Sequence, residues 1–395
     1  MTRGSTPRQT SLERNIIKYA WYKVVTKRVF LPLIAIQLVN AGQVTVGEIA
    51  QIAMITSLAQ IILQLPTGYF ADRFGNKRAI VIGALIAAPS PLFYIVMPNF
   101  LGGLLASLLF FGGWAFQSGA IEAFIHDTLI ALKREKDYTR VMGRSQSFGL
   151  IGNIILITLV PMTYELDTRL PFLIGTLSLV AMVWLAISLA DPHIQQHRRI
   201  SKNPLHALRA IGSIANILLF LFAGFMAAIN SKSGEYTTLL FQSLGIAVTL
   251  FGAIQALSSL LGAGLGFITH WFDRMSARTF YIFDLVVTCL PIIVMGWSRD
   301  SFVVVAASVV LLAYYRIRLI VVQSKLLASM EHTYKSTMLS ALSLFTPLSE
   351  VAAVTILAYF IHSEGYSSGY LSYGLAVLGI GMVLLIPLNL ALKRR

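Results

Sequence analysis

Residues 68–78 read GYFADRFGNKR and lie between two long apolar stretches. Glycines and charges placed between apolar runs predict a short charged turn that joins two membrane helices. We expect Gly68 to let a neighbouring helix approach closely and Gly75 to allow a sharp turn with positive φ. Asp72 can accept hydrogen bonds from a helix end or a basic partner in one conformation only, as a latch would. The alternative is a plain solvated turn.

Composition places the whole chain in a membrane. Hydrophobic residues make up 56% of it and charged residues 12%, against about 25% charged residues in an average soluble domain. Apolar segments of about 20 residues can be marked off twelve times. Their predicted bounds are 16–40, 47–69, 78–98, 101–126, 143–163, 170–190, 211–240, 247–269, 278–297, 301–323, 339–361 and 369–391. The sequence therefore predicts an all-α membrane protein with twelve transmembrane helices.

The formal charge of +14 is distributed unevenly along these segments. If both termini are cytoplasmic, Arg169 and Arg299 are the only two of the 31 Lys and Arg residues in external loops. This asymmetry follows the positive-inside rule, so it indicates a lipid bilayer and not a nucleic-acid partner. We expect a multi-pass protein of the cytoplasmic (inner) membrane, with both termini cytoplasmic and no cleavable signal peptide.

Patterns for metal binding or catalysis are absent from the sequence. The single cysteine, Cys289, permits no intrachain disulfide and no cysteine metal cluster. His126, His270 and His332 are far apart in sequence, and no nucleophile with a His–Asp pair stands out. We expect no metal, no cofactor and no enzymatic activity; a membrane-embedded transferase is a distant alternative.

A hydrophilic stretch at 191–210 divides the twelve segments into six and six. A weak repeat supports this division, because the Asp72-Arg73 pair returns as Asp273-Arg274 after the second segment of the second half. The predicted organisation is a cytoplasmic tail, a six-helix bundle, a cytoplasmic linker and a second six-helix bundle, at 1–14, 15–190, 191–210 and 211–395.

Charged residues inside the first apolar segment are candidates for function. A helix that began after Lys27 and Arg28 would have only residues 29–39 to cross the membrane, about 16 Å, which is too short. We therefore place both cations within the membrane. The alternative is a helix that runs on through Gly42 to Glu48.

The seventh segment is interrupted in a similar way by the polar run NSKSGE at 230–235. Lys232 lies at nearly the depth of Lys27, so we expect basic groups from the two bundles to face a shared cavity. Polar interruptions at matching positions of two halves indicate the binding site of a transporter. The alternative makes 230–238 an external loop.

Basic and aromatic residues adjoin in the tenth segment, where Arg316 follows Tyr314 and Tyr315. Arg318 lies about 160° around the helix from Arg316 and cannot share its face. We expect Arg318 to pair with lipid phosphate or with another helix.

Glu350 is the carboxylate placed most centrally within an apolar segment. An unpaired charge there is costly, so Glu350 must be protonated or paired with a cation. It could couple proton movement to transport, or it could form a fixed ion pair between helices. We expect Glu122 and Asp127 to form a cytoplasmic gate with Arg144 or Lys133.

The segment at 68–78 resembles the loop signature of the major facilitator superfamily, G-x-x-x-D-R-x-G-x-K-R. Its matching positions are Gly68, Asp72, Arg73, Gly75, Lys77 and Arg78. The resemblance implies two six-helix bundles, a central cavity lined by the first, fourth, seventh and tenth helices, and alternating access. It also implies a peripheral ninth helix, so Asp284 is left out of the predicted site.

The resemblance is incomplete where drug–proton antiporters carry further motifs. The fourth segment lacks their arginine-glycine motif, and Gly143, Gly149, Gly152 and Pro161 give only part of their pattern in the fifth. The paired basic residues resemble the arrangement of anion transporters of the superfamily. We therefore predict a monomeric secondary active transporter for a small anionic or amphipathic organic solute, with proton-coupled efflux of drugs or lipids as the alternative.

The predicted site follows from this choice. We assign substrate binding to Lys27, Arg28, Lys232, Tyr236, Tyr314, Tyr315 and Arg316, with the tyrosines covering the apolar part of the solute. Protons are the candidate coupling ion, and Glu350, Glu235, Glu122 and Asp127 are the carboxylates that would carry them.

Overall fold

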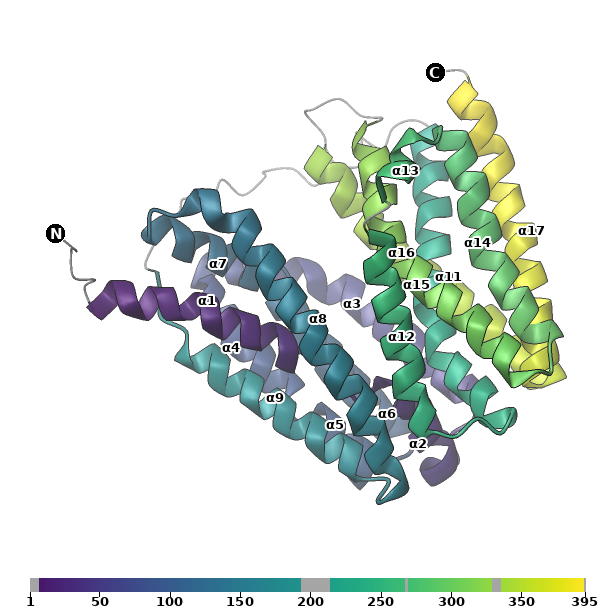
Figure 1. Cartoon of the computed structure of the whole chain (residues 1–395), viewed down its shortest axis with the longest axis horizontal. Coiled ribbons are helices and arrows are strands. Elements are labelled where there is room, and N and C mark those ends of the chain that lie inside the picture. The colour runs from purple at the N-terminus through teal and green to yellow at the C-terminus, as the bar shows by residue number, and fades with distance from the viewer. Residues whose placement is uncertain (1–6, 193–213, 267–268, 329–334, 394–395) are drawn as a thin grey trace. The chain divides into compact units, whose positions relative to one another are not determined.

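The computed structural model of the chain describes residues 7–192, 214–266, 269–328 and 335–393, and these are helical with short connections (Figure 1). Contacts divide the chain into two compact units. Unit 1 comprises residues 1–31 and 59–200, and unit 2 comprises residues 32–58 and 201–395. The predicted linker lies outside the described residues except for its first two positions, so that boundary stays a prediction.

The all-α membrane fold is confirmed for the described residues. Nine of their helices are long and apolar enough to cross a membrane, or ten if a bent pair counts as one span. Two shorter apolar helices, Leu31–Gly42 and Thr249–Leu265, fall below that length. The described helices that meet the length criterion are therefore fewer than the twelve predicted spans. The first predicted span is broken, and the eighth is too short.

The helices of the first half begin with a broken span and then run back and forth. They are α1 (Pro7–Val25), η1 (Leu31–Leu33), α2 (Ile34–Gly42), α3 (Val46–Phe74), α4 (Asn76–Ala87), α5 (Ser90–Val96), α6 (Phe100–Gln117), α7 (Ala120–Ala131), η2 (Glu135–Asp137), α8 (Tyr138–Met162), η3 (Thr163–Glu165) and α9 (Leu170–Ser188). Proline and glycine explain two of the breaks. Pro89 and Pro91 separate α4 from α5, and Gly119, with φ of 78°, separates α6 from α7.

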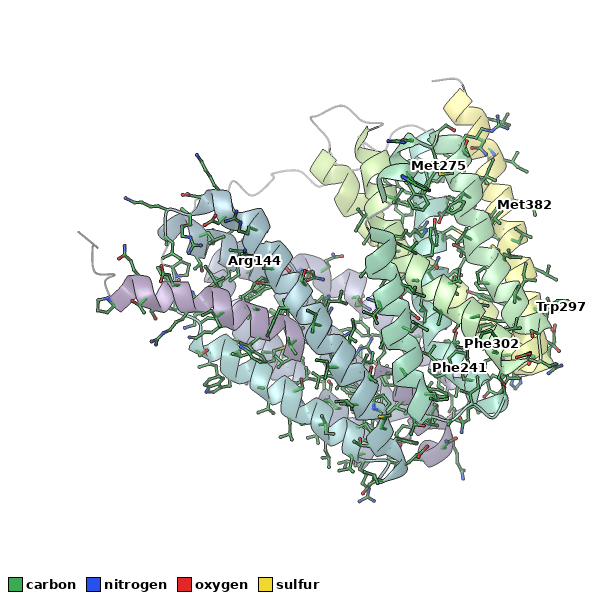
Figure 2. The ribbon with its side chains drawn as sticks, in the orientation of Figure 1. Arg144, Phe241, Met275, Trp297, Phe302 and Met382 are labelled. Atoms are coloured by element: carbon green, nitrogen blue, oxygen red, sulfur yellow. The ribbon has the colours of Figure 1, made fainter. Side chains whose placement is uncertain are left out.

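The second half contains long helices and the short helix α13. They are α11 (Ile214–Ser243), α12 (Thr249–Gly266), α13 (Thr269–Arg274), α14 (Ala277–Trp297), α15 (Ser301–Ala328), α16 (Lys335–Glu364) and α17 (Tyr366–Lys393). Large apolar side chains such as Trp297 and Phe302 are 77% and 80% exposed at the ends of helices (Figure 2). Exposed apolar side chains of this size suit a surface that faces lipid.

The motif at 68–78 is more helical than expected. Helix α3 continues to Phe74, so Asp72 and Arg73 lie in its last turn, and α4 begins at Asn76. Gly75 alone makes the turn with φ of 96°, as predicted. The close approach expected at Gly68 is not found, because a Cβ there would meet no described atom within 4 Å.

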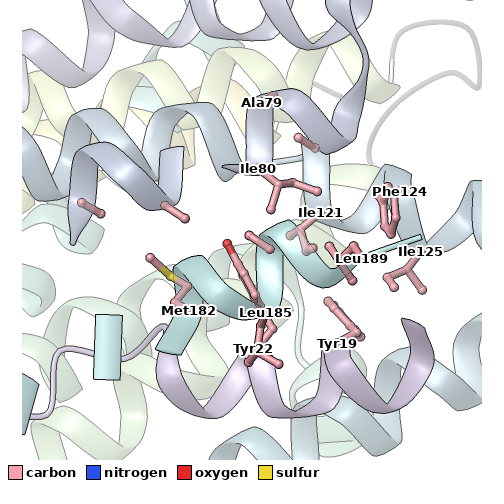
Figure 3. Packing of buried hydrophobic residues seen from close by; sticks show 14 of the residues in the cluster. Tyr19, Tyr22, Ala79, Ile80, Ile121, Phe124, Ile125, Met182, Leu185 and Leu189 are labelled. Carbon is pink, nitrogen blue, oxygen red and sulfur yellow. The ribbon is translucent and has the colours of Figure 1, made fainter. Parts of the chain in front are cut away.

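Unit 1 has an apolar core with buried residues from five helices, α1, α4, α7, α8 and α9, part of which is drawn in Figure 3. Tyr19 of α1, Ile80 of α4, Phe124 of α7 and Met182 of α9 are buried in it. This packing fixes the position of α1, and with it the position of the break that follows.

Glycines bring α4 and α6 together. A Cβ added at Gly113 would lie 2.3 Å from the carbonyl oxygen of Gly83, and one at Gly83 would lie 2.5 Å from that of Gly113. The two helices therefore touch backbone to backbone, which only glycine permits at both positions.

Candidate functional site

The first span breaks at the cations that the sequence places within the membrane. Helix α1 ends at Val25, and η1 starts at Leu31, so Lys27 and Arg28 lie in the non-helical connection. Pro32 supplies the reason, because a proline cannot donate to the carbonyl four residues earlier and its ring clashes with that carbonyl. The alternative of a helix that runs on through Gly42 to Glu48 is wrong, because α2 ends at Gly42 and α3 begins at Val46.

Hydrogen bonds stabilise the backbone at the break. The amide of Leu31 donates to the carbonyl of Arg28 at 2.9 Å, and the amide of Val29 donates to that of Lys27 at 3.0 Å. The hydroxyl of Ser178 on α9 donates to the carbonyl of Val25 at 3.0 Å, which satisfies an acceptor left free at the end of α1.

Glycines of α8 let this part of α1 approach closely. A Cβ at Gly149 would lie 2.7 Å from Cβ of Lys23, and one at Gly152 would lie 2.6 Å from Cγ1 of Val24. The partial glycine pattern of the fifth segment therefore has a packing role in this chain.

Arg28 is backed by aromatic rings of α6. The carbon at the centre of its guanidinium lies 4.6 Å from the ring centre of Phe110 and 4.8 Å from that of Phe111. These are cation–π distances. The side chain is half-buried, and its five N–H groups donate no hydrogen bond to any residue that the structure describes. Lys27 beside it is exposed.

Glu122 and Lys23 form an ion pair between α7 and α1. The distance from Nζ of Lys23 to Oε1 of Glu122 is 2.8 Å, and the ammonium also lies 5.1 Å from the ring centre of Tyr19. The predicted partners of Glu122, Arg144 and Lys133, are wrong, because Lys23 on the neighbouring helix is within reach.

Asp127 lies five residues after Glu122 on α7 and is buried. Its Oδ2 accepts a hydrogen bond from the side-chain amide of Asn76 at 3.2 Å. Asn76 is the first residue of α4, so Asp127 connects α7 to the helix that follows the 68–78 motif. The expected gate between Asp127 and a basic residue stays a prediction.

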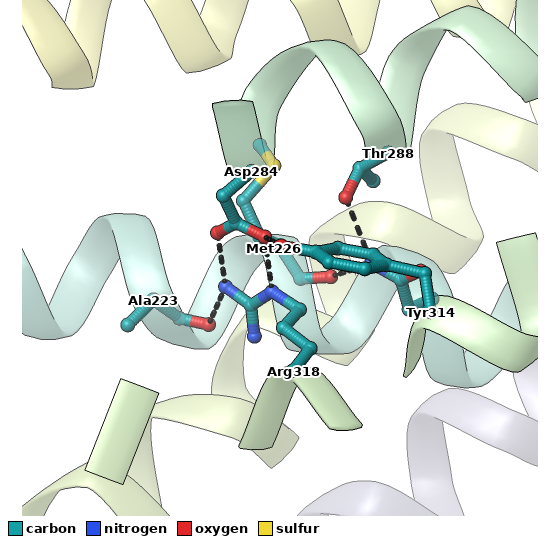
Figure 4. A network of polar contacts seen from close by, with 7 residues as sticks. Ala223, Met226, Asp284, Thr288, Tyr314 and Arg318 are labelled. Atoms are coloured by element: carbon teal, nitrogen blue, oxygen red, sulfur yellow. Dashed lines mark hydrogen bonds and ion pairs between the residues drawn. The ribbon is translucent and has the colours of Figure 1, made fainter. Parts of the chain in front are cut away.

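Unit 2 contains a buried ion pair between Arg318, which was expected to pair with lipid phosphate or another helix, and Asp284, which was left out of the predicted site (Figure 4). Arg318 of α15 donates from Nε to Oδ1 of Asp284 at 2.7 Å and from Nη2 to Oδ2 at 2.8 Å. Arg318 is 2% exposed and Asp284 is fully buried. Nη2 also donates to the carbonyl of Ala223 on α11 at 3.2 Å, so the pair links α11, α14 and α15.

Tyr314 belongs to the same network, because its hydroxyl donates to Oδ1 of Asp284 at 2.8 Å. A solute would have to compete with Asp284 for that hydroxyl, which weakens the assignment of Tyr314 to substrate binding. Pairing of Arg318 with another helix is confirmed.

Helix α11 bends where its apolar run is interrupted. The segments Ile217–Ser231 and Tyr236–Ser243 meet at an angle of 43°, and the residues between them stay helical, so the alternative of an external loop at 230–238 is wrong. Asn230, just before the bend, donates to the carbonyl of Met226 at 2.7 Å and to the hydroxyl of Thr288 at 3.1 Å. The side chains of Lys232 and Glu235 lie outside the described residues.

Arg316 points to a different neighbour from Arg318, as its position on the helix predicts. Its Nη2 donates to the hydroxyl of Ser259 on α12 at 2.6 Å, and the residue is otherwise exposed. Tyr315 is half-buried and Tyr236 is buried.

Glu350 is buried, and its Oε2 accepts a hydrogen bond from the hydroxyl of Ser57 at 2.9 Å. Ser57 belongs to α3, in the part of that helix that groups with unit 2. A serine hydroxyl can serve a protonated or an ionised carboxyl group, so this contact is compatible with either state.

The predicted site residues thus fall into separate groups. Lys27 and Arg28 lie at the break in unit 1, while Tyr314 and Arg316 contact different helices of unit 2. Sequence reasoning missed Asp284, although its position in an apolar segment was a sufficient signal. No group of three His, Cys, Asp or Glu side chains in the described part of the chain is arranged to hold a metal ion.

Comparisons with known proteins agree with this architecture. The family model described as Major Facilitator Superfamily matches residues 24–315. A curated relative, an uncharacterized MFS-type transporter named YxaM from Bacillus subtilis (strain 168), is 21% identical over 358 residues, which cover 87% of this chain and 86% of that protein.

Solved structures share the fold at low sequence identity. The crystal structure of the nucleoside transporter NupG is 13% identical with a TM-score of 0.80, covering 98% of this chain and 100% of that one. The crystal structure of the peptide transporter POT in complex with sulfate is 13% identical with a TM-score of 0.68, covering 96% and 98%. These likenesses concern the fold alone.

Proposed function

The chain belongs to the major facilitator superfamily and is a membrane transporter of that type, and from this premise we propose that its solute is a small organic anion, including amphipathic ones. The solute crosses the cytoplasmic membrane by alternating access, and both chain termini are cytoplasmic. Protons are the proposed coupling ion.

One observation carries the choice of an anion. The guanidinium of Arg28 lies at a break in a membrane-spanning segment, against two phenylalanine rings, with no hydrogen-bond acceptor among the described residues. A buried or membrane-level cation needs a partner, and a planar fork of N–H groups matches a carboxylate or phosphate. The rings beside it provide apolar surface for the remainder of an amphipathic solute.

The carboxylates of the same unit favour an anion over a cationic drug. Glu122 is paired with Lys23, and Asp127 accepts a hydrogen bond from Asn76, so both are engaged within the unit. A cationic solute would have to displace one of these partners, whereas an anion can bind Arg28 directly.

The remaining predicted residues take supporting parts in this proposal. Lys27 adds positive charge beside Arg28, and Lys232 and Arg316 are the candidate anion-binding cations of unit 2. Tyr236 and Tyr315 contribute aromatic surface. Glu350 and Glu235 are the carboxylates that take up and release protons, and Asp72 acts as the latch at the end of α3.

Transport in proteoliposomes tests the proposal. A thermal-shift screen of anionic metabolites, cationic drugs and lysolipids first selects a ligand, and its radiolabelled form is then followed during uptake. We expect Arg28→Ala to reduce uptake at least tenfold, with partial recovery in Arg28→Lys, because lysine keeps the charge and loses the planar fork. Arg140→Ala, an exposed arginine of α8, is the control.

Two outcomes contradict the proposal. Stabilisation by cationic drugs alone would support efflux of cations in its place. Unchanged uptake of an anionic ligand in Arg28→Ala, Lys27→Ala and Lys232→Ala would remove the basic residues from the binding site.

A further inference from the structure

Helices α12 and α15 of unit 2 carry a cluster of polar side chains, Arg316, Ser259 and Gln255. The proposed function uses only Arg316 of these. Arg316 reaches from α15 to α12, where its Nη2 donates to the hydroxyl of Ser259 at 2.6 Å. Ser259 itself is 1% exposed and donates to the carbonyl of Gln255 at 2.8 Å, so its oxygen is free to accept from the arginine. The hydrogen bond from Ser259 to the carbonyl of Gln255 orients the serine hydroxyl, and the hydroxyl in turn fixes the position of the guanidinium.

A glycine makes the space for the arginine. A Cβ added at Gly262 would lie 2.7 Å from Cδ and 3.1 Å from Cβ of Arg316, and 3.1 Å from the carbonyl oxygen of Ala313. The stem of Arg316 therefore lies directly on the backbone of α12. Gly262, Ser259 and Gln255 are spaced by three and four residues, so they lie along one face of that helix.

The third member of this face has an unsatisfied acceptor. The side-chain oxygen of Gln255 is buried, and no described residue donates a hydrogen bond to it. Gln255 precedes Ser259 by four residues, about 6 Å of rise, and helical side chains point towards the N-terminus. The face thus has an exposed cationic donor at one level and, about a turn away, a buried acceptor without a donor.

We propose that Arg316, Ser259 and Gln255 form a solute subsite for molecules that carry an anionic group and, about one helical turn away, an N–H or O–H donor. The anion binds the free edge of the Arg316 guanidinium, which Ser259 holds in place, and the donor binds the side-chain oxygen of Gln255. A buried acceptor without a donor is unfavourable, so a solute that supplies the donor is preferred over one of the same shape that lacks it.

This inference rests on the proposed transport of anions and narrows it. A simple anion satisfies Arg28 and Arg316 equally well. Gln255 adds the requirement for an N–H or O–H donor. Anionic solutes with such a donor at a second polar end are therefore preferred over those without one.

A matched pair of rigid probes tests the subsite by calorimetric binding to the purified full-length protein. 4-(Hydroxymethyl)benzoate carries a carboxylate and a hydroxyl at opposite ends, and 4-ethylbenzoate has the same shape without the donor. We expect the wild type to bind the hydroxymethyl probe about tenfold more tightly. Gln255→Leu and Gln255→Met remove that preference and keep the affinity for 4-ethylbenzoate, while Gln242→Leu, a glutamine of the same unit, leaves the preference unchanged.

The outcomes separate this inference from the proposed function. Equal binding of both probes to the wild type, or a preference that survives in both Gln255 variants, overturns the subsite. If binding of 4-ethylbenzoate still depends on Arg28 in that case, the anion proposal stands. If neither probe binds the wild type, the subsite is overturned as well. The thermal-shift screen of anionic metabolites then tests the anion proposal independently. Gly262→Ala adds a geometric check, because displacement of Arg316 from Ser259 should weaken both probes.

Discussion

Arg318 and Asp284 form a fully desolvated, two-hydrogen-bond ion pair that joins α15 to α14. The hydroxyl of Tyr314 donates a further hydrogen bond to Asp284, and the carbonyl of Ala223 accepts one from Arg318 (Figure 4). Each charge is therefore matched in an interior where an unmatched one is strongly unfavourable. The pair determines how three helices of unit 2 fit together.

Removing one member of this pair should destabilise the protein more than removing both. Arg318→Leu leaves the Asp284 carboxylate buried without its partner, and we expect a loss of about 3–5 kcal/mol. The double variant with Asp284→Leu should recover a large part of that loss, because no buried charge is left. Thermal unfolding in detergent measures the order of the variants, with Arg299→Leu in an exposed connection as the control. A double variant as unstable as the sum of the two single changes would contradict this account.

The contact between Gly83 and Gly113 makes a second prediction. Gly113→Ala places a methyl group 2.3 Å from the carbonyl oxygen of Gly83, so α4 and α6 must move apart at a cost of about 1–3 kcal/mol. Gly143→Ala is a matched control, since a Cβ there meets no described atom within 4 Å and alanine favours the helix. The unfolding midpoint should fall in the first variant and hold or rise in the second. Equal midpoints would mean that the two helices separate without cost.

The ion pair between Lys23 and Glu122 should behave differently from the one in unit 2. Its side chains are 19% and 36% exposed, so water screens the attraction, and solvation replaces much of what is lost when the pair is broken. We expect Glu122→Gln to change the free energy of unfolding by less than about 1 kcal/mol. The same thermal measurement in detergent checks it, beside Arg318→Leu. A loss as large as that of Arg318→Leu would show that the pair is desolvated in the membrane.

The sequence predicted those features that depend on local chemistry. Composition and apolar run length predicted the helical membrane fold, and the glycine of the 68–78 motif predicted the positive φ at Gly75. Helix periodicity separated Arg316 from Arg318 correctly. Each of these depends on neighbours a few residues away, which a single sequence contains.

Pairings between distant helices could not be predicted in the same way. Asp284 was left aside, and Arg318 was expected to pair with lipid phosphate or with a helix that was not specified, although each lies in an apolar segment, where a charge requires a partner. The register that brings α14 and α15 together depends on the packing of whole helices, which the two residues do not encode locally. Glu122 was likewise matched to the wrong cation, because the break at Gly119 sets the direction of α7.

Glu350 allows a test that separates proton coupling from binding. Glu350→Gln keeps an oxygen that can accept the hydrogen bond from Ser57, so the fold should be retained, but glutamine cannot take up or release a proton. If Glu350 carries the coupling proton, accumulation driven by a pH gradient should be lost in proteoliposomes, while exchange of labelled for unlabelled solute across the membrane continues. Exchange needs binding and alternating access but no net proton movement, so it reports the rest of the cycle. Glu364→Gln, at the exposed end of α16, is the control and should keep both activities. Full accumulation in Glu350→Gln would assign coupling to another carboxylate and leave Glu350 as a structural contact of Ser57.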